Sequence, residues 1–263
     1  MTGACGLWAY AITEHDGEDA LTEHGGGDLS RLTGVAGVTV RVAAADGFTV
    51  LVSDVDLAEF GEVALRRNLE NLTWLEEVAR AHHHVIEAAI RLFPLLPTRL
   101  ATVYSSAAAM AAALARRREE LRAALRRVGG RVEWGVKTYA APVQAGGETA
   151  RGEVGAGGAG LAYLKRRRAQ LTASERSARA ALAGARAVHE ELSGRAAQAR
   201  LVPPQSAQLS GNQMPMLLNT AYLLDESASD GFASAVADAA STHPELRLEL
   251  TGPWPPYSFA GED

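Results

Sequence analysis

Hydrophobic and polar positions alternate in three stretches near the start of the chain, which predicts three β-strands before residue 56. The run "GLWAYAIT", residues 6–13, is mostly apolar and reads as a first strand. Residues 38–45 and 48–55 alternate apolar with small or polar side chains on either side of Asp46-Gly47. That pair readily takes the positive φ of a tight turn, so these two stretches predict a β-hairpin.

Apolar residues at spacings of three and four then predict helices. A helix is expected to begin with a capping box at Thr73, and an Ala-rich helix to run from Ser105 or Ser106 to Gly129-Gly130. The prolines of "FPLLPTRLATVYSS" are expected to stop this first helix and to confine any strand to about residues 98–104. The apolar stripe of the first helix comprises Leu75, Val78, His82, Val85, Ala89 and Leu92.

The remaining pattern predicts a two-domain α+β protein. The strand "RVEWGVKTY" completes an N-terminal mixed α+β sheet domain over residues 1–140. Residues 141–158 are rich in Gly and Ala without an apolar period, which indicates a linker. Residues 159–263 then predict a smaller α+β domain, in which a long helix precedes a strand, a second helix and a last strand.

Composition and charge limit the classes of protein. The 263 residues are 47% hydrophobic and carry a net charge of −5, and they contain no apolar run near the roughly 20 residues that span a bilayer. The single cysteine, Cys5, cannot form an internal disulfide, which fits a reducing cytoplasm. The basic residues between 61 and 200 alternate with alanines and lack interleaved aromatic residues that could stack on bases. We therefore expect a cytoplasmic protein that binds neither nucleic acid nor membrane.

Motifs for catalysis, cofactors and metals are missing or out of context. His82, His83 and His84 are consecutive, so on a helix they point about 100° apart and cannot converge on one metal ion. Residues 155–160, "GAGGAG", match G-x-G-x-x-G, but no strand immediately precedes them. We expect no catalytic, cofactor-binding or metal-binding residues, and hence no enzyme.

Two other classes of function stay open. One is a small-molecule or nucleotide-binding enzyme that uses the cleft between the two domains, with "GAGGAG" near a phosphate. The other is a nucleic-acid or anionic-surface binder built on the basic helices at 116–127 and 165–200.

The stretch "TGPWPPYSFA", residues 251–260, concentrates aromatic residues and prolines. Proline has no amide hydrogen to donate to a sheet, so the last strand is expected to stop near Leu250 and the chain to continue extended. Its aromatic side chains either fill the core of the second domain or form a rigid ridge for a partner. We expect Trp254 to pack inward, with Tyr257 and Phe259 nearer the surface.

Three motifs carry a resemblance to a known family. The chain reads "TGPWPPYSFA" after a strand, "NTAYLLDES" before a helix and "GLAYLKRRR" at the head of the long helix. The N-terminal half contributes "WAYAIT", "HHHVIEAAI", "PLLPTRLATVYSS" and "VEWGVKTY" in the same order. Together these resemble the gas vesicle GvpL/GvpF family over almost the whole chain. The family usually reads close to "PLRFGTVF" where this chain has "PTRLATVY", so Arg99 is kept while Ala101 replaces a glycine and Leu100 an aromatic residue.

The resemblance implies an accessory protein of gas vesicle formation that is not an enzyme and has a ferredoxin-like C-terminal half. Such a protein would bind the small hydrophobic shell subunit (GvpA-like) and other accessory proteins during nucleation or assembly, and would associate with the vesicle in the cytoplasm. The partner-binding residues that the shared motifs imply are Arg99, Tyr163, Arg166, Arg167, Trp254, Tyr257 and Phe259.

Overall fold

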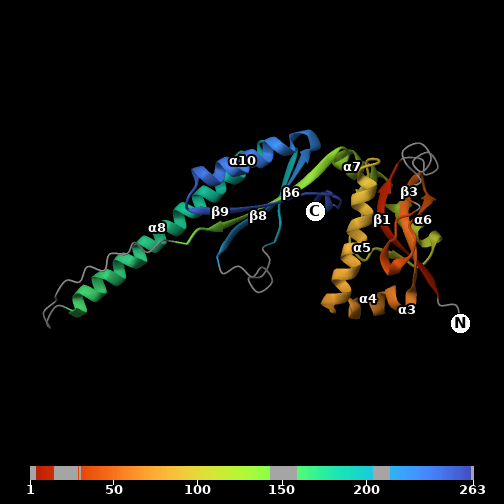
Figure 1. The fold of residues 1–263 in the computed structure, drawn as a ribbon, viewed down its shortest axis with the longest axis horizontal. Helices are drawn as coiled ribbons and strands as arrows, with labels where there is room; N and C mark the ends of the chain where they lie inside the picture. The colour runs from red at the N-terminus through yellow and green to blue at the C-terminus, as the bar shows by residue number, and fades with distance from the viewer. Residues whose placement is uncertain (1–3, 15–28, 30, 143–158, 204–213, 262–263) are drawn as a thin grey trace. The chain divides into compact units, whose positions relative to one another are not determined.

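The computed structural model describes residues 4–14, 29, 31–142, 159–203 and 214–261. It divides into two compact units, one made of Met1–Glu133 with Pro253–Asp263 and the other of Trp134–Gly252. Figure 1 shows the elements of both units. The chain is α+β, with one antiparallel sheet in each unit.

The first unit is built on a sheet in the order β2-β3-β1-β4, with β5 also paired to β1. Strand β1 is buried from Gly6 to Thr13, because α5 packs on one of its faces and other helices cover the sheet elsewhere (Figure 1). The strands are β1 (Cys5–Thr13), β2 (Arg41–Ala45), β3 (Phe48–Asp56), β4 (Leu96–Pro97) and β5 (Val103–Tyr104). The helices are α3 (Leu57–Phe60), α4 (Glu62–Asn68), α5 (Leu72–Ile90), α6 (Ala107–Arg116) and α7 (Arg118–Val128), with a 3-10 turn η1 at Val35–Gly37.

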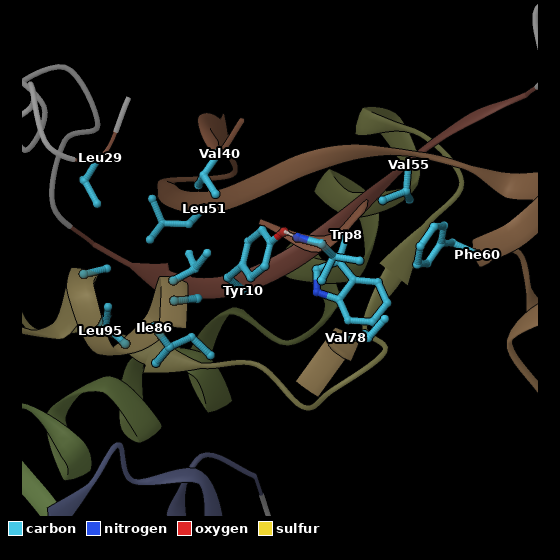
Figure 2. Close-up of a cluster of buried hydrophobic side chains, with 14 of the residues drawn as sticks. Trp8, Tyr10, Leu29, Val40, Leu51, Val55, Phe60, Val78, Ile86 and Leu95 are labelled. Carbon is cyan, nitrogen blue, oxygen red and sulfur yellow. Dashed lines mark hydrogen bonds between the residues drawn. The ribbon is translucent and has the colours of Figure 1, made fainter. Parts of the chain in front are cut away.

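The core of the first unit gathers side chains of β1, β3 and α5 (Figure 2). Trp8 and Tyr10 are fully buried there, and their polar atoms have partners. The Trp8 indole donates to Nδ1 of His82 at 3.0 Å. The Tyr10 hydroxyl lies 2.6 Å from Ser53 Oγ and accepts from the Val35 amide at 2.8 Å. Paired polar atoms let these large rings fill the core without leaving an unsatisfied group.

His82 is a neutral core residue, as the apolar stripe predicts. An indole N–H can only donate, so Nδ1 of His82 must be the acceptor and Nε2 carries the proton. Nε2 lies 3.2 Å from the carbonyl of Thr98, to which it donates. Burial lowers the pKa of His82 to about 4, with the Thr98 carbonyl opposing the shift and nearby His83 adding to it.

The second unit has a ferredoxin-like β-α-β-β-α-β order, with its sheet arranged β7-β8-β6-β9. Four α8 residues at spacings of four, three and four pack on α10 and the sheet: Ala181, Ala185, Val188 and Leu192. The elements are β6 (Arg131–Ala140), α8 (Ala159–Ser193), β7 (Gln198–Leu201), β8 (Met216–Asp225), a 3-10 turn η2 (Glu226–Ala228), α10 (Ser229–Thr242) and β9 (Leu246–Trp254). A last 3-10 turn, η3, covers Tyr257–Phe259.

This division differs in two places from the one expected from the sequence. The strand assigned to residues 131–139 of the N-terminal domain is β6, an inner strand of the second sheet, and from Trp134 onward it belongs to the second unit. The last residues, Pro253–Asp263, belong to the first unit. The linker expected at 141–158 and the glycine motif at 155–160 lie almost wholly outside the described residues.

Some of the predicted turns and element boundaries agree with the structure and others do not. The hairpin is confirmed, since Asp46 and Gly47 have φ of 56° and 77°. The limit of residues 98–104 for any strand there holds for β5 but not for β4, which lies at residues 96–97 and includes Pro97. The expected helix start at Thr73 is also wrong, because Asn71 caps α5. The Ala-rich helix begins at the Ser106 cap as expected but breaks at Arg117 into α6 and α7.

Candidate partner-binding site

The segment from Pro253 to Gly261, here called the tail, differs most from what the sequence pattern predicts. Strand β9 runs to Trp254 instead of stopping near Leu250, and it includes Pro253. A proline is tolerated there because β9 is an edge strand. On its outer side no neighbouring strand needs the amide hydrogen that proline lacks. Beyond β9 the chain passes through buried Pro255 and Pro256 into the turn η3.

Trp254 was expected to be buried and Phe259 to lie nearer the surface, but the structure shows the reverse. Phe259 is 0% exposed, Tyr257 is partly buried and Trp254 is 44% exposed. Neither Phe259 nor Tyr257 fills the core of the second unit: η3 packs on α7, and Tyr257 lies against the core cluster of the first unit. The inward position expected for Trp254 is therefore wrong, and Phe259 takes that role.

Two side chains of the first unit hold the backbone of the tail. Arg127 on α7 donates from Nε and Nη2 to the carbonyl of Phe259, at 3.2 and 2.9 Å, and from Nη2 to that of Gly261 at 3.4 Å. Glu133 accepts from the amide of Ser258 at 2.7 Å and from its hydroxyl at 2.6 Å. Both interactions involve a charged group, which makes them stronger than ordinary neutral hydrogen bonds.

His83 on α5 contacts both remaining aromatic residues of the tail. Its Nδ1 lies 3.0 Å from the Tyr257 hydroxyl, and its ring meets the Trp254 ring edge-on with centroids 5.6 Å apart. Burial, together with the carboxylates of Glu133 and Glu87, raises the pKa of Tyr257, so the phenol keeps its proton. Trp254 is thus supported on one side by His83 and open on the other.

Arg99 lies in the turn between β4 and β5, beside the end of the tail. The turn is closed by Thr102, whose amide and hydroxyl donate to the Arg99 carbonyl at 3.2 and 2.7 Å. A Cβ added at Gly261 would lie 2.9 Å from Nη2 of Arg99, so the guanidinium group borders the tail backbone. Arg99, Trp254, Tyr257 and Phe259 therefore all lie in the first unit, and Arg99 borders the end of the tail.

Tyr163, Arg166 and Arg167 lie elsewhere, on the first half of α8 in the second unit. Every residue from 163 to 176 is exposed, and Tyr163 is 64% exposed. Residues 163–180 carry six basic side chains against Glu175. This half of α8 is a basic helical surface with a few apolar side chains.

The three histidines diverge as the helical geometry predicts. His82 points into the core, His83 contacts the tail and His84 is exposed. Within the described ranges, no group of three or more His, Cys, Asp or Glu side chains could hold a metal ion. Of the helices that the structure describes, none is long and apolar enough to cross a membrane.

Sequence reasoning missed the residues that fix the tail: His83, Arg127 and Glu133. Each pairs with a tail residue more than 120 positions away. No local pattern signals such a pairing, because periodicity reports only neighbours along one element.

Comparison with known proteins identifies the family. The family model described as gas vesicle synthesis protein GvpL/GvpF matches residues 6–261. Gas vesicle protein L of Streptomyces sp. (strain CB03234) is 39% identical over 229 residues, which cover 87% of this chain and 85% of that protein. Gas vesicle protein F1 of Halobacterium salinarum (strain ATCC 700922 / JCM 11081 / NRC-1) is 38% identical over 65 residues, 22% of this chain and 30% of that protein.

Two solved structures share the fold. The gas vesicle protein GvpF from Anabaena sp. PCC7120 aligns with a TM-score of 0.66 and 22% identity, covering 98% of this chain and 97% of that one. The GvpF from Microcystis aeruginosa aligns with a TM-score of 0.63 and 18% identity, covering 98% and 99%. Because the family model matches nearly the whole chain, the chain belongs to the gas vesicle GvpL/GvpF family.

Proposed function

We propose that this chain binds the small hydrophobic shell subunit of the gas vesicle, and other accessory proteins, during nucleation or assembly of the vesicle. Membership of the family gives the chain a role in gas vesicles. The observation that carries the finer proposal is Trp254, an aromatic side chain 44% exposed at a position fixed by its neighbours.

An exposed tryptophan on a fixed backbone is well suited to bind an apolar partner. Phe259 anchors the tail on one side and β9 continues it on the other, so Trp254 has little backbone freedom to lose on binding. Tryptophan is among the residues enriched at the energetic centres of interfaces. A small hydrophobic shell subunit would expose apolar surface and strand edges before it polymerises, and a protein bound to it would reduce its aggregation.

The first half of α8 is a second surface for protein partners. Its exposed Tyr163 and Leu164 lie next to Arg166 and Arg167. We propose that this basic surface binds other accessory proteins through acidic segments, because charge complementarity selects partners and speeds their association.

Co-expression of the full chain with its shell subunit tests the proposal. A tagged chain is expected to retain the shell subunit through purification, and an equally tagged unrelated α+β protein is expected not to. Recovery of the chain without shell subunit, at salt concentrations both low and physiological, would contradict the proposal.

A further inference from the structure

The first unit contains a cavity of about 400 Å³ under the end of the tail. Ile12, Leu96 and Leu121 contribute an apolar part of its lining, and Ala260 and Gly261 border it from the tail. Its volume lies within the range of small-ligand sites, and its lining is polar and apolar in similar measure.

The polar lining of this cavity carries one more positive than negative charge. Arg99, Arg117 and Glu120 all line it. The Nε of Arg117 donates to Oε2 of Glu120 at 2.7 Å, with a second contact from Nη2 to Oε1. This fork lowers the pKa of Glu120, which is therefore an ionised carboxylate that offsets Arg117. Among the lining residues that the structure describes, the charge of Arg99 is not offset.

Two hydrogen-bond donors in the cavity have no partner among the described residues: the guanidinium group of Arg99 and the hydroxyl of Tyr104. Burial raises the pKa of Tyr104, so its hydroxyl keeps a proton to donate. Both residues line the same cavity, and a planar guanidinium fork and a phenol O–H are the kinds of donor that bind the two oxygens of a carboxylate.

We propose that this cavity binds a single carboxylate carried on an apolar group: an acidic side chain or a chain terminus presented by an apolar peptide segment. Arg99 would bind the carboxylate with help from the Tyr104 hydroxyl, and the apolar lining would receive the neighbouring side chain. A phosphate dianion fits less well, because one net positive charge neutralises a single carboxylate but not a dianion.

The test uses the full chain, capped dipeptides and ligand-observed NMR at physiological salt, without any gas vesicle partner. Acetyl-Leu-Leu with a free terminal carboxylate and acetyl-Leu-Glu amide distinguish the two sources, and acetyl-Leu-Gln amide is the neutral control. At least one acidic peptide is expected to saturate the protein, the neutral one is expected not to, and inorganic phosphate is expected not to compete. Failure of both acidic peptides, equal binding of the neutral peptide or displacement by phosphate would overturn the proposal.

Variants assign the binding to this cavity. Arg99→Gln is expected to weaken binding at least about tenfold and Tyr104→Phe about threefold or more, because each removes a donor to a charged acceptor. Arg91→Gln removes an arginine that is 72% exposed and pairs with Glu87 on α5, so it is expected to bind as the parent does. Unchanged melting temperatures establish that the variants are folded. If Arg99→Gln were misfolded, Tyr104→Phe alone would decide, and parental affinity in either folded variant would contradict the assignment.

Discussion

Arg127 and Phe259 are 132 positions apart, yet two nitrogens of the Arg127 guanidinium group donate to the Phe259 carbonyl. The Phe259 ring is 0% exposed. The last aromatic residue of the chain is therefore part of the core of the first unit, and it fixes the backbone on which Trp254 is exposed.

Phe259→Ala is expected to destabilise the protein by about 3–5 kcal/mol, as other truncations of buried aromatic residues do. Trp254→Ala is expected to cost about 1 kcal/mol or less, because the residue is already 44% exposed. Denaturant unfolding followed by circular dichroism measures both. A stable Phe259→Ala variant, or a Trp254→Ala variant less stable than Phe259→Ala, would contradict the burial of Phe259 and the exposure of Trp254.

Arg127→Met is expected to loosen the tail while leaving α7 in place. Hydrogen bonds from a charged donor contribute about 1.5–3 kcal/mol, so chymotrypsin should cleave at Tyr257 or Phe259 about tenfold faster. Arg126→Met, on the exposed side of the same helix, is the matched control. Equal cleavage rates in the two variants would mean that Arg127 does not hold the tail.

Ala101→Gly is expected to stabilise the protein by about 0.5–1 kcal/mol. Ala101 has a φ of 65°, in the left-handed region that a side chain disfavours and glycine accepts. The exposed Ala112 in helix α6 gives the opposite control, since Ala112→Gly should cost about 1 kcal/mol. Thermal unfolding is expected to show a higher melting temperature for Ala101→Gly and a lower one for Ala112→Gly. A lower melting temperature for Ala101→Gly would show that the backbone at Ala101 is not strained.

Stability is expected to fall as the pH drops through the range set by His82. The unfolded histidine takes up a proton below about pH 6.5, whereas the folded one resists until about pH 4. Between these two pH values the native state therefore binds fewer protons than the unfolded state. At pH 4 the free energy of unfolding is expected to be lower by about 3 kcal/mol than above pH 6.5. The ring resonances of His82 followed by NMR against pH check this: a midpoint near pH 6.5 would show that the ring is not desolvated as described.

Local patterns in the sequence predicted much of the fold. The apolar stripe from Val78 to Ala89 identified the buried face of α5, including His82. Asp46-Gly47 identified the hairpin between β2 and β3. These succeed because the residues that determine each element are its own neighbours along the chain.

Long-range relationships could not be predicted in the same way. The strand "RVEWGVKTY" alternates as any half-buried strand does, and nothing in it says which sheet contains it. The prolines of the tail suggested the end of β9 but not its edge position, where Pro253 is tolerated. The buried environment of Phe259 depends on α7, which lies more than 130 positions earlier.

Partner binding by the motif residues stays a prediction. Of these residues, Arg99, Trp254, Tyr257 and Phe259 lie in the first unit. The predicted burial of Trp254 and Phe259 was reversed, because the sequence shows where aromatic residues lie but not which of them is buried. Trp254 is the residue left exposed, and it carries the proposed function.

The most direct test of that function is the affinity of the purified chain for its shell subunit, measured for the parent, Trp254→Ala and Leu201→Ala. Leu201 is 60% exposed on β7 of the second unit and serves as the matched exposed apolar control. Loss of Trp254 is expected to weaken binding by about 2 kcal/mol or more, roughly 30-fold, with the melting temperature nearly unchanged. The Leu201→Ala variant should bind as the parent does. Parental affinity in Trp254→Ala would contradict the proposal that the exposed face of the tail binds the shell subunit.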